Sequence, residues 1–347
     1  MTRAVLVAGA GGVGKTTIAA AIGVAAARAG KSTLVLTVDP ARRLAGALGL
    51  DHIGNDPTPT PGEPLLAAAM LDASASWEAI VRRHADPDTV ERLVTSRFFR
   101  AVADRFPAGQ AYAGAEEMSV HLESGAFDLV VVDTPPSAGG IDFFLSPGRM
   151  RTLVGGRILR WLTGPKIPGR RALYAITARP VLKVADTLLG GPLLEDVAEF
   201  LLDLRTAYDG ISRRARQVER HLRGAVSIVV TTADPTPVRE AVRFFRELPA
   251  AAPTPAAIVF NRALPLDWRH AGAPEGPPDL AEALAGTLDR WGSEAQRQAD
   301  VRSEFVERYD VLPTVIPWLT VAPTDRDSLA GLLAASEGTD LTVLATS

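Results

Sequence analysis

The sequence contains no cysteine among its 347 residues. This absence excludes disulfide bonds, thiolate metal sites and thiol catalysis. Methionine is also scarce, at four residues, so the chain lacks the methionine-rich surface of adaptable binding proteins. The five histidines follow no metal-ligand spacing, and surface or packing roles are the default for each: His52, His84, His121, His221 and His270.

The sequence also has no large excess of positive or negative charge. The chain has 37 lysines and arginines against 40 acids, for a net charge of −3, so we do not expect nucleic acid as a partner. No apolar run reaches the roughly 18 residues that a transmembrane helix needs, and no secretory leader precedes the first strand-like run. We therefore expect no integral membrane segment and a cytoplasmic location, with any membrane contact peripheral.

Alternating strand-like and helix-like segments predict an α/β fold. We expect a parallel sheet covered by helices, with a helical insertion. Strands are expected at 4–8, 32–38, 65–71, 127–133, 226–231, 256–260 and 314–316. Helices are expected at 15–29, 235–248, 279–309 and 325–335, with a proline-rich loop at 54–64 and a polar tail at the end.

The domain division follows from where strand signals stop and resume. Residues 1–140 and 224–347 are predicted to form the core, and 141–223 a helical insertion to whose subdomain the helical stretch 74–124 contributes. The insertion mixes many apolar residues with basic ones. This pattern fits either ordinary core packing or a groove for a hydrophobic client helix.

One motif near the start organises the chain. The apolar run 4–8 enters a glycine-dense turn, and an alanine-rich helix begins near Lys15. Gly9, Gly14, Lys15 and Thr16 satisfy the pattern G-x-x-x-x-G-K-[ST], in which backbone N–H groups converge on a phosphate. We expect Lys15 to contact the β- and γ-phosphates and the Thr16 hydroxyl to bind magnesium.

The same turn also matches a dinucleotide fingerprint. Gly9, Gly11 and Gly14 fit G-x-G-x-x-G, and Asp39 ends the next apolar run, roughly where a ribose-binding acid is expected. However, the Lys-Thr pair directly after the last glycine has no purpose in that arrangement. Asp133 closes another strand-like run, as a magnesium-binding nucleotidase requires. The phosphate-loop interpretation is favoured, and dinucleotide binding is the remote alternative.

Further polar residues follow other predicted strands, at the edge where ligands of α/β sheets collect. A functional Asp39 would orient the attacking water, whereas its structural alternative is a helix N-cap before Pro40. Asn261 and Arg262 stand where residues that select the base would lie. Pro317 begins a segment that is predicted to form a loop over the purine.

The order of these motifs resembles that of the arsenical pump-driving and tail-anchored-protein targeting ATPases, an ArsA-like group with a deviant Walker A motif. The resemblance spans nearly the whole chain. It implies a parallel α/β sheet of the P-loop NTPase type, wrapped by helices, with an inserted helical subdomain. It also implies a dimeric Mg-ATPase that opens and closes with ATP turnover and handles a hydrophobic or membrane-associated client. The matching segments are Gly11–Thr17, Val38–Ala41, Val132–Pro136, Asn261–Arg262 and the segment that starts at Pro317.

The resemblance also implies individual roles. Asp39 would position the hydrolytic water, Thr16 would coordinate Mg²⁺, and Asp133 would reach the metal through water. Asn261 would read the adenine, with Arg262 and Pro317 nearby. The residues expected to hold the phosphates of ATP are Gly11, Gly12, Val13, Gly14, Lys15, Thr16 and Thr17.

The departures from the family pattern concern its metal sites and its dimer. Without cysteine, neither the arsenite site nor the zinc-linked dimer of relatives can be transferred. Arg42 replaces the histidine that many relatives carry. Ala10 occupies the position of the signature lysine, which in relatives reaches the partner's nucleotide. A homodimer should then hydrolyse ATP feebly unless Arg42 or Arg43 substitutes.

Two hypotheses follow for the activity. In the first, the chain is an ATPase subunit that drives handling of a client through the helical insertion. In the second, it is a regulatory or structural subunit that binds ATP but turns it over poorly. Members of the bacterial branch that it resembles can occur as two adjacent, dissimilar chains, which favours a homologous ATPase partner over a homodimer.

Overall fold

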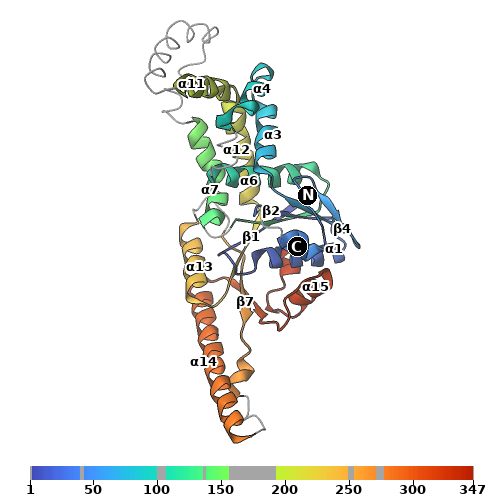
Figure 1. Cartoon of the computed structure of the whole chain (residues 1–347), viewed down its shortest axis with the longest axis vertical. Helices are drawn as coiled ribbons and strands as arrows, with labels where there is room; N and C mark the ends of the chain where they lie inside the picture. Colours follow the sequence, from blue (N-terminus) through green and yellow to red (C-terminus); the bar gives the residue numbers. More distant parts are fainter. Residues whose placement is uncertain are drawn as a thin grey trace. The chain divides into compact units, whose positions relative to one another are not determined.

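The computed structural model describes residues 2–39, 43–99, 107–135, 138–155, 193–248, 254–270 and 277–346 (Figure 1). The chain divides into two compact units. The first unit comprises Met1–Leu71, Met118–Phe144 and His221–Ser347. The second unit comprises Asp72–Glu117 and Leu145–Arg220.

The first unit is built on a nine-stranded sheet with the order β3-β4-β2-β5-β1-β6-β7-β8-β9. Every neighbouring pair between β4 and β8 is parallel. The mostly parallel α/β fold that the sequence predicts is therefore confirmed. The strands of this parallel part are β1 (Arg3–Gly9), β2 (Thr33–Thr37), β4 (Glu63–Met70), β5 (Leu129–Asp133), β6 (Val226–Thr231), β7 (Ala257–Ala263) and β8 (Leu312–Pro317).

Both faces of the sheet are covered, which explains why its central strands are continuous apolar runs. Val5 and Val7 belong to the cluster formed with α1 (Lys15–Arg28) and α15 (Arg326–Ala334). Because side chains alternate along a strand, the neighbouring positions face the other side. There Phe260 of β7 meets Phe305 of α14 (Pro278–Tyr309), with ring centroids 5.9 Å apart. The remaining helices of this unit are α2 (Arg43–Leu48), α13 (Pro235–Glu247), the 3-10 helix η2 (Leu266–His270) and α16 (Leu341–Thr346).

Two edges of the sheet differ from the sequence predictions. The predicted loop 54–64 is wrong in part, because β3 (Thr58–Thr60) pairs antiparallel with β4. Its Pro59 is tolerated because an edge strand need not donate every backbone hydrogen bond. The predicted polar tail is also wrong. The strand β9 (Glu337–Gly338) pairs with β8, and α16 follows it with Leu341 and Ala345 buried.

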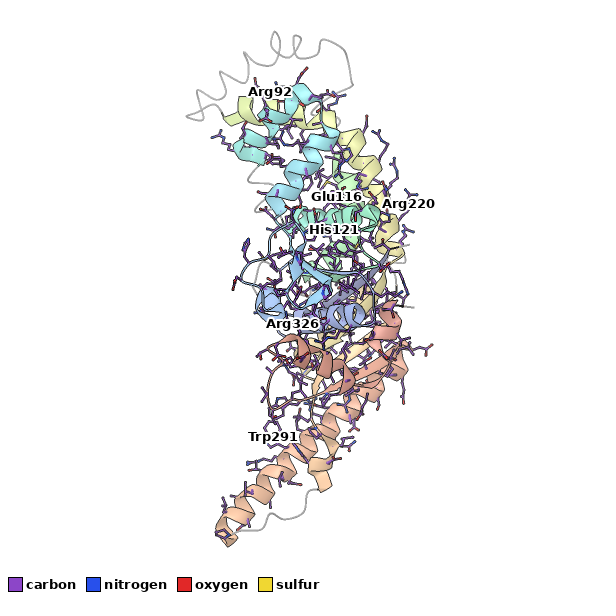
Figure 2. The ribbon with its side chains drawn as sticks, turned by 90° about the vertical axis from the view of Figure 1, so that its right-hand side faces the viewer. Arg92, Glu116, His121, Arg220, Trp291 and Arg326 are labelled. Atoms are coloured by element: carbon purple, nitrogen blue, oxygen red, sulfur yellow. The ribbon has the colours of Figure 1, made fainter. Side chains whose placement is uncertain are left out.

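The described residues of the second unit form helices joined by short connections, and 156–192 lie outside them. A buried ion pair joins two of its helices: Arg214 Nε donates to Glu116 Oε1 over 2.7 Å, and both side chains are less than a tenth exposed (Glu116 is labelled in Figure 2). Its helices are α3 (Ala73–His84), α4 (Pro87–Thr95), α11 (Leu193–Leu204), the 3-10 helix η1 (Arg205–Ala207), and parts of α6 (Pro107–Ser124), α7 (Ala138–Gly155) and α12 (Tyr208–Arg223). Among the described residues, no helix has the length and apolar character to cross a bilayer.

Candidate functional site

The turn between β1 and α1 has a backbone that only glycine adopts easily. Gly9 has φ +146° and Gly14 has φ +101°, both in the region that favours glycine. A Cβ on Gly9 would overlap the carbonyl oxygen of Val230 on β6. The glycines therefore allow the chain to turn tightly against the neighbouring strand and to present the N-terminus of α1, an anion-binding position.

Asn261 of β7 forms a hydrogen bond with this turn. Its Nδ2 donates to the carbonyl oxygen of Val13 over 2.8 Å, and its Oδ1 accepts from the backbone N–H of Arg262 over 3.0 Å. A Cβ on Gly14 would overlap the same Nδ2. The structure thus brings Asn261 into contact with the phosphate loop. Arg262 is exposed and has φ +59°, at a register shift in β7.

Lys15 is the buried cation of the site. Its side chain is 8% exposed, and Nζ donates to the carbonyl oxygen of Ala10 over 3.0 Å. Burial lowers the pKa of Lys15, while the carboxylates of Asp133 and Asp39 act in the opposite direction. An ammonium group held away from water beside a helix N-terminus attracts anions, because its charge is incompletely solvated.

Asp133, at the end of β5, accepts hydrogen bonds from two hydroxyl groups. Its Oδ2 accepts from Thr16 Oγ1 over 2.6 Å and from Thr37 Oγ1 over 3.0 Å. Val7 and Thr37 are both in register with Asp133, which aligns the ends of β1, β2 and β5. Sequence reasoning missed Thr37, although a polar residue at the last position of an apolar strand was a usable signal.

The electrostatics of Asp133 suit a cation. The residue is 1% exposed. Burial raises the pKa of its carboxyl group, and the hydrogen bond from Thr16, the charge of Lys15 and the hydrogen bond from Thr37 lower it. Its Oδ1 is buried and accepts no hydrogen bond within the described part of the chain. An uncommitted carboxylate oxygen in such a place is suited to a magnesium ion or to water bound to it.

The available donors fit magnesium. This ion prefers oxygen ligands and keeps several waters, using one or two protein groups together with substrate phosphates. The Thr16 hydroxyl and the Asp133 carboxylate are such oxygen donors, 2.6 Å apart. Among the described residues no group of three or more histidines, cysteines or acids forms a closed metal cage. A magnesium ion here would therefore be held largely by phosphate and water.

Asp39 lies two residues beyond the end of β2, at the same sheet edge. Its backbone N–H donates to Thr37 Oγ1 over 3.3 Å, and its charge acts on Lys15. Residues 40–42, which include Arg42, lie outside the described residues, as does Pro136. The described chain resumes at Arg43, where α2 begins. Arg43 also lowers the pKa of Lys15, so its charge reaches the site.

Pro317 ends β8 beside the end of β7. It is in register with Ala263, whose carbonyl oxygen accepts from the N–H of Trp318 over 2.8 Å. The two strand ends that carry Asn261 and Pro317 are therefore adjacent, as the sequence led us to expect. No described contact joins Pro317 to the phosphate loop.

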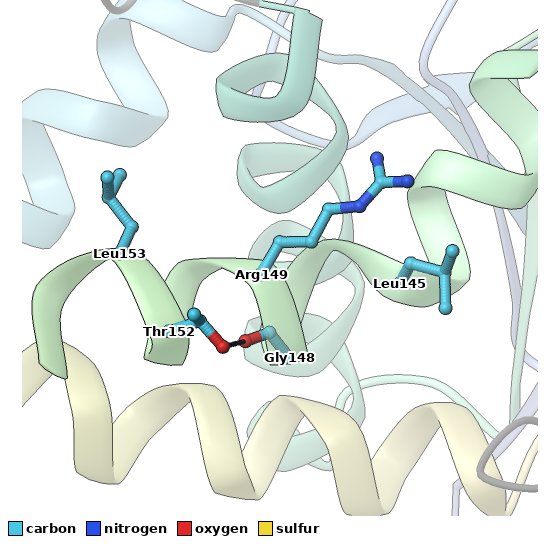
Figure 3. Close-up of a pocket in the computed structure, with 5 residues that line it drawn as sticks. All are labelled: Leu145, Gly148, Arg149, Thr152 and Leu153. Carbon is cyan, nitrogen blue, oxygen red and sulfur yellow. Dashed lines mark hydrogen bonds between the residues drawn. The ribbon is translucent and has the colours of Figure 1, made fainter. Parts of the chain in front are cut away.

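A separate pocket lies in the second unit, along α7. It has a volume of about 490 Å³ and is lined by Leu145, Gly148, Arg149, Thr152 and Leu153 (Figure 3). Leu145, Arg149 and Leu153 follow one side of the helix, while Thr152 Oγ1 donates to the carbonyl oxygen of Gly148 over 3.0 Å. Leu153 is 53% exposed. This pocket offers aliphatic side chains next to one arginine.

Comparison with known proteins identifies relatives over most of the chain. A model of the family described as anion-transporting ATPase matches residues 2–270. An uncharacterized protein of Streptomyces coelicolor is 30% identical over 298 residues, which cover 83% of this chain and 69% of that protein. ATPase GET3 of Mycosarcoma maydis is 25% identical over 264 residues, 74% of this chain and 71% of that protein. A Halobacterium salinarum protein, provisionally named an arsenical pump-driving ATPase, is 32% identical over 145 residues, 39% of this chain and 22% of that protein.

Proposed function

Because the chain belongs to the family of anion-transporting ATPases, whose model matches residues 2–270, we propose that it binds MgATP and hydrolyses it to ADP and phosphate. The observation that carries this proposal is the arrangement of Lys15, Thr16 and Asp133. A buried ammonium and a hydroxyl–carboxylate pair stand at one helix N-terminus. Phosphoryl transfer needs these charges for positioning and charge stabilisation rather than for covalent chemistry.

Each residue has a definite task in this proposal. The backbone from Gly11 to Thr17 and the ammonium of Lys15 would bind the phosphates, and Thr16 and Asp133 would hold magnesium. Magnesium, when bound, neutralises charge on the phosphate oxygens. Asp39 orients the attacking water in line with the bond that breaks. Asn261, Arg262 and Pro317 would border the base.

Asp39 provides the test of hydrolysis. Asp39→Asn keeps the size of the side chain but removes the charge that orients water. We expect nearly unchanged MgATP affinity and turnover lower by about two decades or more, the range of groups that position water or protons. Binding by calorimetry and phosphate release measure the two effects. An equal loss of binding and turnover would instead favour the N-cap role of Asp39.

The absence of the signature lysine supports a partner subunit. Ala10 stands in the loop and contributes a carbonyl oxygen to Lys15, but its methyl group cannot neutralise a phosphate across a dimer interface. We propose a heterodimer with a homologous ATPase chain that supplies this charge, with a homodimer as the alternative. The same observation favours the second candidate function, a weakly hydrolysing nucleotide-binding subunit.

The helical subdomain is the proposed surface for a hydrophobic or membrane-protein client. Two features support this: the pocket on α7 beside the exposed Leu153, and the start of α7 at Ala138, shortly after Asp133. Hydrogen exchange in residues 139–223 should therefore change between the ADP and ATP states. Changes confined to the phosphate loop and Asp39 would contradict a client role for this subdomain.

A further inference from the structure

Positive charge is concentrated in one stretch of the sequence. Residues 145–223 contain fifteen lysines and arginines against seven acids, although the whole chain has a net charge of −3. The remainder of the chain therefore carries eleven more acids than bases. A near-neutral protein with such asymmetry has one strongly basic region, and such regions bind anionic surfaces.

The structure places three of these arginines on one face of α12. Arg213, Arg216 and Arg220 are exposed and are spaced by three and four residues, which puts them on one side of a helix. They extend over about 10 Å of its length. Arg220 points outward from the helix in Figure 2. We call these three residues the arginine ridge. The opposite face is buried and consists of Ile211, Ala215, Val218 and Leu222.

The arginine ridge is not neutralised by the protein. None of its three members forms an ion pair with another residue in the described ranges, in contrast to their neighbours. Arg214 of the same helix is buried against Glu116, and Arg151 of α7 pairs with Glu219 over 2.8 Å. Glu116 and Glu219 thus pair with arginines outside the ridge, and the ridge keeps its charge for an external anion.

Apolar side chains accompany this charge. The Arg151–Glu219 pair fixes α7 beside α12, and α7 exposes Leu153 at its pocket. An exposed leucine beside a basic helix combines apolar and charged surface, as proteins that lie at a membrane interface do.

We propose that the arginine ridge docks the second unit on a membrane rich in anionic phospholipid. A membrane requires only one basic face with apolar side chains nearby, and both are present. A long nucleic acid requires a continuous basic path, which the acidic remainder of the chain does not provide. This docking goes beyond the proposed ATPase and is independent of it, because no ridge residue belongs to the nucleotide site.

Vesicle flotation tests the proposal with the full-length chain. Wild-type protein should float with vesicles of equal parts phosphatidylcholine and phosphatidylglycerol, but not with pure phosphatidylcholine. Binding should fall as salt is raised, because screening weakens charge attraction. In the variant Arg213→Gln, Arg216→Gln, Arg220→Gln, partitioning should drop about a hundredfold, since each basic residue near an anionic surface contributes separately. ATP turnover should stay unchanged.

The chain offers a matched control on α13. Arg239, Arg243 and Arg246 are exposed with similar spacing, but Arg243 pairs with Glu247 and the helix belongs to the acidic first unit. Changing these three to glutamine removes the same charge and should leave flotation intact. The proposal would be overturned if both triple variants lost flotation equally, or if the wild-type protein floated equally well with neutral vesicles. It would also be overturned if the ridge were needed to bind single-stranded RNA and the protein did not bind vesicles. Far-ultraviolet circular dichroism checks that each variant is folded.

Discussion

Replacing Lys15 by alanine is expected to weaken MgATP binding at least about a hundredfold, because truncating one member of a buried charge pair costs several kcal/mol. The Lys15 ammonium is buried and bonded only to the carbonyl oxygen of Ala10 among the described residues, so it is available for a phosphate. Without it, the negative charge of the β- and γ-phosphates would face Asp133 and Asp39 uncompensated. Calorimetric titration with MgATP measures the effect.

The matched control for this variant is Lys31→Ala. Lys31 is exposed, just after α1, so the same chemical change there should leave MgATP affinity unaltered. Thermal unfolding of both variants checks that the folded state persists. Unchanged MgATP affinity in folded Lys15→Ala would remove the phosphate-loop assignment, and with it the proposed ATPase.

The second large effect concerns Ala10. Losing a charge that acts in trans on the transferred phosphoryl group lowers turnover by about 10³-fold or more. The unmixed chain should therefore hydrolyse ATP feebly. Ala10→Lys should raise turnover by up to about this factor if the chain forms a homodimer, whereas Ala10→Gln, which adds length without charge, should not. Steady-state phosphate release and mass measurement in solution follow activity and assembly.

A partner that retains the lysine gives the complementary experiment. Co-expression with the nearest ATPase paralogue should restore turnover, and changing that paralogue's lysine to alanine should remove the gain. Arg43 is the candidate for compensation within the chain whose charge acts on Lys15 in the described residues. Arg42 lies outside the described residues. The missing-lysine argument would be contradicted if the wild-type chain alone hydrolysed ATP rapidly and the double variant Arg42→Ala, Arg43→Ala hydrolysed it equally fast.

The sequence was informative wherever the signal is local. Continuous apolar runs predict buried parallel strands, and the strand β5 ending at Asp133 follows that pattern. The resemblance to ArsA-like ATPases, drawn from short motifs at strand ends, is confirmed by the family match over residues 2–270. The strands β3 and β9 escaped prediction because two or three residues become a strand only through their partners.

The contacts that define the site are not local. Asn261 braces Val13 from 248 residues away, and Thr16 reaches Asp133 across 117. The motifs placed these residues at one site, but they did not specify which atoms contact each other. The glycine turn matched two fingerprints because the glycine spacings of the two motifs overlap. The contact between Thr16 and Asp133 favours the phosphate loop over dinucleotide binding, because only the former uses a hydroxyl and a carboxylate together. The assigned roles of these residues stay predictions.

The most direct test of the central claim is calorimetric titration of the wild-type chain with ATP, first with magnesium and then with a chelator, and with NAD in a parallel run. The Thr16 hydroxyl and the Asp133 carboxylate, whose Oδ1 accepts no hydrogen bond from the described residues, lie at the site of the buried Lys15 ammonium. We therefore expect one ATP to bind per chain. Affinity should fall when magnesium is removed, and NAD should produce no heat of binding. Binding of NAD without ATP, or ATP affinity that is indifferent to magnesium, would contradict the account.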